Sequence, residues 1–277
     1  MQTVKGMFFA MPGMGKTTAI ATGVGDPRLD PYLWLDFEDG RNAIFSKTTE
    51  YDIDSIDGKG EPAKPAQGKI NYVRSKDLSD LDFVITHFER SEKEHAKDPT
   101  KPKYFGFRTL VIDNWSEVDS LGIEEAKQFC KKRGYKDSDG EMAGRPEYNR
   151  LLTQTMDYIR RLRDLDINLF ITAHQRETKD EKIGTITYTP KITGQAATGI
   201  PGLLQLVVNI QPASGSDRKK RIFYFQPQWN ILCVKDNFEL SELGDSQEFG
   251  KTDRILPLIL DGLGLALPPE KAAKASK

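Results

Sequence analysis

The stretch Phe8–Gly23, FFAMPGMGKTTAIATG, decides how the N-terminal part of this chain folds. It begins with apolar residues, passes through a proline and two glycines, and continues with small residues at helical spacing. This order predicts a buried strand over Met7–Met11, a tight turn, and a helix that begins at Lys16.

A turn of this composition suits a bound phosphate group. The segment Ala10–Thr17 fits the phosphate-loop pattern, with Ala10 at the position of the usual first glycine. Two glycines let the backbone curl so that N–H groups point at phosphate oxygens, and the helix presents its positive end to the same anion. We expect Lys16 to bridge the β- and γ-phosphates of ATP and the Thr17 hydroxyl to bind Mg²⁺. The predicted nucleotide-binding residues are Pro12, Gly13, Met14, Gly15, Lys16, Thr17 and Thr18. The alternative is a glycine-rich strand-to-helix turn with an accidental Gly-Lys-Thr.

Acidic residues follow two further apolar strands. Thr109–Asp113, TLVID, ends in an aspartate that we expect to hold Mg²⁺ through water. Tyr32–Gly40, YLWLDFEDG, places Asp36 and Glu38 at a strand end that we expect to lie next to the phosphate loop. A carboxylate there can accept a proton from the water that attacks the γ-phosphate, and Glu38 is favoured over Asp36. Alternatively, these acids only solvate the end of a strand.

A later apolar strand, Leu169–Glu177 (LFITAHQRE), ends in His174 and Gln175. A hydrogen-bonding side chain at the tip of a central strand can touch the γ-phosphate and change position when it leaves. The alternative interpretation is that His174 caps the strand end.

The order of predicted elements indicates the fold class. Strands that alternate with helices favour a three-layer α/β fold with a mostly parallel sheet. Amphipathic helices are predicted over 77–97 and 147–165, and late strands over 202–212, 218–227 and 230–238. The late strands are expected to extend the sheet in antiparallel fashion at one edge. One domain is predicted over residues 1–265, followed by a disordered tail over 266–277.

Four segments, taken in order, resemble one family. They are FFAMPGMGKTT, LWLDFEDG, TLVIDNWSE and NLFITAHQ, and with their spacing they are similar to the RecA-like phage nucleotide-binding proteins. These are compact AAA-type ATPases of bacteriophages, some of them single-strand annealing recombinases. The resemblance covers roughly residues 4–240. It implies a RecA-like P-loop core, Glu38 as the catalytic base, and His174 or Gln175 as the sensor of the γ-phosphate.

The sequence departs from the family near its last core strand. RecA-like ATPases often carry a Lys and an Arg there that reach into a neighbour's site. This chain has Lys235, but Asn237 stands where an Arg would be expected. Lys235 is either a lone finger toward a neighbouring subunit or a solvated lysine, and without a finger ATP turnover is expected to be slow.

Two basic segments are candidates for single-stranded DNA. Both are predicted as loops, over Lys127–Arg145 and Gln175–Gly202, and both mix cations with aromatic residues. Cations can hold phosphates while rings stack on bases, and the resemblance places DNA loops after these same strands. The predicted DNA-binding residues are Lys131, Lys132, Arg133, Arg176 and Lys191. Alternatively, both are solvated surface loops. A further basic cluster, Ser216–Arg221, is predicted as a hairpin tip, and contact with DNA or a neighbouring subunit is an additional option for it.

Composition limits the remaining options. The 277 residues carry a formal net charge of −1, which excludes a globally basic nucleic-acid coat. Two cysteines without a CxxC pair give no zinc framework, and no apolar run is long enough to span a membrane. The two cysteines suit a reducing cytoplasm, and the resemblance implies that this is the cytoplasm of the bacterial host.

Three functional hypotheses follow. The first is an ATP-dependent phage protein that binds single-stranded DNA and assists annealing or recombination. It would work as a homo-oligomer, alongside a single-strand-binding protein or another phage recombination protein. The second is a helicase-loader or remodelling ATPase activated by a protein partner. The third is a small-molecule kinase, which would need an arginine-rich lid. The arginines of the 147–165 helix are better explained as the solvent-exposed face of that amphipathic helix.

Overall fold

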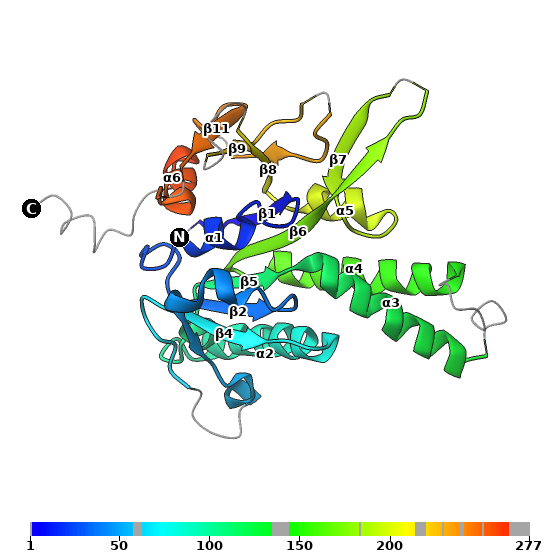
Figure 1. The fold of residues 1–277 in the computed structure, drawn as a ribbon. Coiled ribbons are helices and arrows are strands. Elements are labelled where there is room, and N and C mark those ends of the chain that lie inside the picture. The colour runs from blue at the N-terminus through cyan, green and yellow to red at the C-terminus, as the bar shows by residue number, and fades with distance from the viewer. Residues whose placement is uncertain are drawn as a thin grey trace, which may run out of the picture.

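The computed structural model describes residues 2–57, 63–134, 144–182, 184–213, 220–228, 230–238, 241–250 and 252–265. Within these residues, eleven strands form one sheet with helices on both faces (Figure 1). The strands are β1 (Lys5–Ala10), β2 (Tyr32–Asp36), β3 (Thr48–Glu50), β4 (Ile70–Arg74), β5 (Thr109–Asp113), β6 (Asn168–Lys179), β7 (Ile186–Pro190), β8 (Leu206–Pro212), β9 (Arg221–Tyr224), β10 (Lys235–Asp236) and β11 (Ser246–Phe249). The α-helices are α1 (Lys16–Ala21), α2 (Leu78–Lys97), α3 (Trp115–Lys132), α4 (Arg145–Asp164), α5 (Ala196–Leu203) and α6 (Ile255–Gly262). Four short 3₁₀ helices are η1 (Gly40–Ala43), η2 (Phe45–Lys47), η3 (Ile53–Asp57) and η4 (Lys103–Gly106).

The strand order confirms the predicted fold class. Along the sheet it is β11-β9-β8-β1-β6-β5-β2-β4-β3, and the run from β8 to β3 is parallel. Strands β9 and β10 pair antiparallel with β8, as expected. Strand β8, the first of the predicted late strands, is instead parallel to β1, and β11, which pairs antiparallel with β9, was not predicted. Strands β6 and β5 stand between β1 and β2, yet Glu38, just past the end of β2, is close enough to Lys16 of the phosphate loop to raise the pKa of that lysine.

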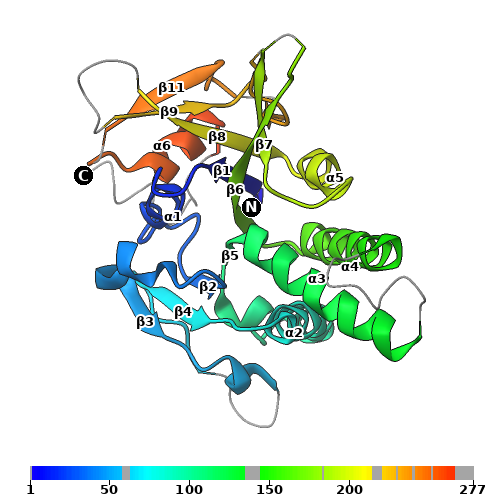
Figure 2. The same cartoon turned by 45° about the vertical axis from the view of Figure 1, so that its right-hand side comes forward.

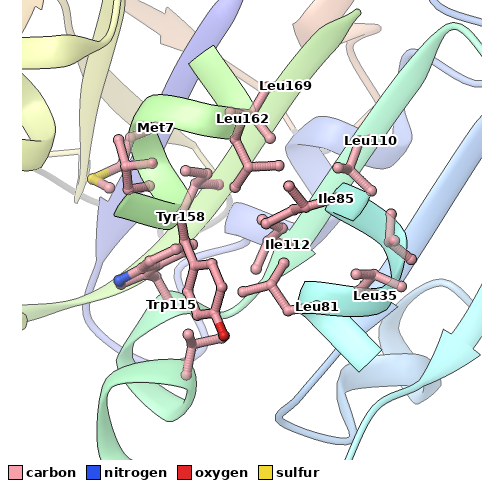
Figure 3. Close-up of a cluster of buried hydrophobic side chains, with 14 of the residues drawn as sticks. Met7, Leu35, Leu81, Ile85, Leu110, Ile112, Trp115, Tyr158, Leu162 and Leu169 are labelled. Atoms are coloured by element: carbon pink, nitrogen blue, oxygen red, sulfur yellow. The ribbon is translucent and has the colours of Figure 1, made fainter. Parts of the chain in front are cut away.

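Side-chain alternation divides the core between the two faces of the sheet. Helices α2, α3, α4 and α5 cover one face, over a cluster that includes Met7, Leu35 and Ile112 (Figure 3). Helices α1 and α6 pack on the other face, against residues such as Trp34, Val111 and Phe170. Figure 2 shows α1 and α6 on one side of the central strands and α2–α4 on the other.

The same alternation selects which polar residues meet beyond the strand ends. On β5, Asp113 shares the α1 face with Val111, and on β6, His174 shares it with Phe170. Gln175, one residue further along β6, belongs to the opposite face. The alternation of side chains along each strand therefore decides on which face of the sheet each of these polar residues lies.

Helix α3 was missed by the sequence analysis, and this corrects the first predicted DNA loop. Residues up to Lys132 are helical rather than a loop that begins at Lys127. The helix forms because the Asn114 side chain caps it by accepting a hydrogen bond from Glu117 N. Its buried positions, among them Val118, Ala126 and Cys130, follow helical spacing.

The second predicted DNA loop is mostly regular structure as well. Strand β6 continues to Lys179 because it pairs with β7 in an antiparallel hairpin, with Glu177 opposite Tyr188. Helix α5 follows. The strand predicted over 202–212 begins only at Leu206, and that over 230–238 is reduced to β10 with an isolated bridge at Ile231.

Some predictions lie outside the described residues. They concern the segment 135–143, most of the basic cluster 216–221, and the tail 266–277.

Candidate functional site

The turn between β1 and α1 has the backbone that a phosphate loop requires. Gly13 and Gly15 have φ values of 75° and 89°, in the left-handed region where a side chain is strained. Pro12 and Thr18 are exposed, while Met14 packs in part against the α1-side core. Gly15 precedes α1 without a side-chain cap, so no side-chain oxygen from that residue accepts from the N–H groups of the first turn.

Lys16 is the buried cation of this turn. Only 6% of it is exposed, and its Nζ lies 3.5 Å from the carbonyl oxygen of Ala10. Burial lowers the pKa of Lys16, while the charges of Glu38 and Asp113 raise it. These two carboxylates therefore lie within electrostatic reach of the ammonium group.

Thr17 and Asp113 meet as the phosphate-loop interpretation requires. Thr17 Oγ1 donates to Asp113 Oδ2 at 2.8 Å, and Thr172 Oγ1 donates to Asp113 Oδ1 at 2.5 Å. Burial raises the pKa of Asp113 to about 6, the two threonines oppose this, and nearby Asp36 and Glu38 add to it. The side chain is 1% exposed.

The oxygen atoms of this pair are of the kind that Mg²⁺ prefers. A hydroxyl and a carboxylate fit an ion that takes its other ligands from phosphate and water. In the described part of the chain, no three His, Cys, Asp or Glu side chains gather as a metal site. Thr17 and Asp113 would hold the ion together with oxygen ligands from a bound nucleotide and water.

Glu38 lies in a cluster with two side chains from neighbouring strand ends. His174 Nε2 lies 2.9 Å from Glu38 Oε1, and the side-chain amide of Asn114 donates to Glu38 Oε2. The same amide nitrogen lies 3.0 Å from His174 Nε2. The hydrogen bond from His174 lowers the pKa of Glu38, burial raises it, and Asn114 and Lys16 lower it further. We call these three residues the Glu38 cluster.

Asp36 supports the backbone that carries Glu38. Its Oδ1 accepts from Glu38 N at 2.9 Å, and its Oδ2 accepts from the Tyr72 hydroxyl at 2.6 Å. Both oxygens are thus already bonded within the protein. Burial raises the pKa of Asp36.

Gln175 is directed away from this group. Its Oε1 accepts from Asn209 Nδ2 at 2.9 Å and from Gln211 Nε2 at 2.8 Å, on the face opposite α1. Asn209 also donates to the carbonyl oxygen of Phe9, so this amide network braces the end of β1. The structure brings His174, but not Gln175, to Glu38.

Lys235 also lies apart from the phosphate loop of its own chain. Its Nζ donates to the carbonyl oxygen of Gly202 at 3.1 Å, and β10 pairs near the start of β8. Burial lowers the pKa of Lys235. A role for this residue toward a neighbouring subunit stays a prediction.

The predicted DNA-binding residues occupy separate elements. Lys131 and Lys132 end α3, and Arg133, its C-cap, stacks 5.2 Å from the Phe129 ring centroid. Arg176 is exposed on the β6–β7 hairpin, which projects from the body of the molecule (Figure 1). Lys191 stands where that hairpin returns, and its N–H donates to the carbonyl oxygen of His174 at 2.7 Å.

Three site residues were not found from the sequence: Asn114, Ser116 and Thr172. Ser116 Oγ accepts from His174 N–H and donates to the carbonyl oxygen of Lys191, both at 2.9 Å. Asn114 could have been found from the sequence, because an Asn followed three residues later by a Glu is a typical pattern at the start of a helix. Thr172 could have been predicted from the alternation of side chains along a strand, because it stands two residues before His174 and therefore lies on the same face of β6.

Comparison with known proteins identifies the class. The family described as AAA domain matches residues 2–233, and the chain belongs to this family. No curated protein matches the chain. Among solved structures, the chain is similar to the RadB recombinase, with a TM-score of 0.44 and 10% identity, covering 90% of this chain and 88% of that chain. No helix in the described ranges has both the length and the apolar character needed to cross a bilayer.

Proposed function

We propose that this protein binds and slowly hydrolyses ATP and uses it to control a grip on single-stranded DNA during annealing or recombination. The observation that carries the nucleotide part is the meeting of Lys16, Thr17 and Asp113 at a glycine-dependent turn. Membership of the AAA domain family supports the same assignment.

Each residue has a chemical role in this proposal. The backbone of the turn and Lys16 bind the phosphates, and Thr17 and Asp113 would hold Mg²⁺, which neutralises charge on the β- and γ-phosphates. Glu38 accepts a proton from the attacking water. His174 is the proposed sensor of the γ-phosphate, and its contact with Glu38 supports this role.

The DNA part rests on the β6–β7 hairpin and the end of α3. Arg176 and the hairpin cations Lys179 and Lys182 are exposed, as are Lys131 and Lys132. Such side chains can follow a phosphate backbone. In line with the RecA-like resemblance, we propose a phage protein that works in the host cytoplasm as a homo-oligomer. A single-strand-binding protein or another recombination protein is its proposed partner.

ATP hydrolysis by the purified protein, with and without single-stranded DNA, tests this function. We expect DNA to stimulate hydrolysis and Glu38→Gln to abolish the stimulated rate, because the amide cannot accept the proton. Asp39→Asn, which changes an exposed carboxylate one residue away, is the matched control. If DNA neither binds with ATP at low salt nor stimulates hydrolysis, the recombinase proposal fails and a protein activator becomes the candidate.

A further inference from the structure

The outer ends of α3 and α4 border a cavity of about 810 Å³, and none of its described lining residues belongs to the nucleotide turn. This volume lies within the range of about 300 to 1,000 Å³ that is typical of sites for small ligands. Figure 1 shows these helix ends on the same side of the molecule as the β6–β7 hairpin. The lining residues that matter here are Phe129 of α3 and Arg145, Arg150, Gln154 and Asp157 of α4.

An aromatic ring holds Arg150 in this cavity. Its Cζ lies 3.5 Å from the centre of the Phe129 ring, which is van der Waals contact. In the described part of the chain, its guanidinium forms no hydrogen bond and no ion pair. By contrast, Arg161 on the same helix donates to Glu89 Oε1 at 2.8 Å and to Asp82 Oδ1 at 3.0 Å. A guanidinium plane that no anion occupies can stack on a nucleobase.

Two polar atoms of the lining residues are buried and lack a hydrogen-bond partner among the residues described: Arg150 Nε and Gln154 Oε1. Residues four apart share one face of a helix, so this donor and this acceptor belong to the same face of α4. Buried polar groups are normally bonded, and an unpaired donor and acceptor in one cavity point to a ligand that completes them. The edges of nucleobases carry donors and acceptors of this kind.

The helix ends around the cavity carry cations that no acid neutralises. Four exposed cations have no carboxylate partner among the residues that the structure places, and these are Lys131, Lys132, Arg133 and Arg145. Asp157 is the acidic residue of the described lining, and 63% of its side chain is exposed to solvent. Exposed cations can take the phosphates of a single strand while one of its bases turns inward.

We propose that the cavity between α3 and α4 binds an unstacked base of single-stranded DNA, with the Arg150 guanidinium as the plane on which the base stacks. The exposed cations at the helix ends hold the phosphates on either side of that base. This inference rests on the proposed DNA function and assigns to it a base-binding site separate from the hairpin. Because every base has a face that can stack, the site tolerates different sequences.

The test compares two fluorescent strands of equal length in the presence of Mg²⁺ and ATP. One is an oligothymidylate, and the other is an abasic strand with the same phosphates but no bases. Arg150→Lys keeps the charge and removes the planar group. We expect this variant to bind the oligothymidylate about tenfold more weakly than wild type, or by about 1.4 kcal/mol, because one stacked base is lost. Its affinity for the abasic strand should stay the same.

The matched control is Arg160→Lys, at an exposed position of the same helix, and it should leave both affinities unchanged. A second readout needs no variant. An oligothymidylate that carries one 4-thiothymidine, irradiated in complex with the wild-type protein, should form crosslinks to Phe129 or to residues 145–154.

Three results overturn the base-binding site and leave the DNA function standing. They are an unchanged affinity of Arg150→Lys for the oligothymidylate, an equal loss of affinity on both strands, and crosslinks confined to the β6–β7 hairpin. If the wild-type protein binds neither strand at low salt, the DNA function itself fails and the base-binding site falls with it.

Discussion

At the scale of single residues, the site is a set of polar groups that burial makes costly to charge. Asp113 is the clearest case, because its pKa is raised to about 6 although two threonines donate to it. The unfolded chain would ionise this group near its ordinary value of 3.8. Between these values the folded state holds a proton that the unfolded state has released, so stability falls as pH rises.

We therefore predict a pH-dependent stability in the absence of metal. As pH rises from about 4 to about 6, the ionisation of Asp113 should lower the free energy of unfolding by about 3 kcal/mol, since one pKa unit corresponds to about 1.36 kcal/mol. Denaturant unfolding of wild type and Asp113→Asn in a chelator checks this. The difference in the free energy of unfolding between the two proteins should grow as the pH rises over this range and stay constant above it. A constant difference from pH 4 upward would contradict it.

At the scale of elements, the strand ends were predictable and the connections were not. The β1 turn, Asp113 and Glu38 follow from local pattern, because a strand that ends in a polar residue leaves a plain signal. Helix α3 was missed because its apolar positions are spaced among charged residues and include a glycine. The β6–β7 hairpin was missed because its pairing is set between segments of mixed polarity, which resemble a loop.

The hairpin also carries a prediction about DNA. Replacing Arg176, Lys179 and Lys182 with alanine should weaken single-stranded DNA binding and lower its dependence on salt. The slope of log K against log salt should fall by roughly 0.7 for each DNA phosphate that the variant no longer neutralises. Binding titrations over a range of salt concentrations measure this.

The control variant replaces Lys93, Lys97 and Lys101 on and after α2, which removes the same charge from exposed positions. In both views α2 lies at the opposite end of the molecule from the hairpin (Figures 1 and 2). If both triple variants lose the same affinity, the effect comes from net charge, and the hairpin is not the DNA surface.

At the scale of the whole molecule, one sheet joins both core clusters to the nucleotide turn. A ligand at the end of β1 therefore stabilises the entire fold if it binds only the folded state. Sequence pattern gave the sheet class and its parallel sense, because alternation of strands and helices is a global signal. It did not give the strand order, since no local pattern places β6 and β5 between β1 and β2.

We predict that Mg²⁺ and ATP at about 100 times the dissociation constant raise the free energy of unfolding by about 2.7 kcal/mol. Lys16→Ala should abolish this gain because the phosphates lose their buried cation. The variant itself should remain folded, since burial lowers the pKa of Lys16 and the charged group is costly there. Thermal unfolding with and without nucleotide measures both effects. An equal gain in Lys16→Ala would show that nucleotide binds elsewhere.

The sorting of β6 residues between the two faces has a consequence for how relatives of this chain can vary. One inserted residue before His174 would carry its imidazole to the place of Gln175, in the network of Asn209 and Gln211. One deleted residue would instead bring the Gln175 amide to the place of His174, where it faces Glu38. We expect insertions and deletions among relatives to spare the segment from Leu169 to Gln175. Beyond Gln175, we expect the hairpin to vary in length among relatives, because the residue pairs between β6 and β7 belong neither to the group around Glu38 nor to the network of Asn209 and Gln211.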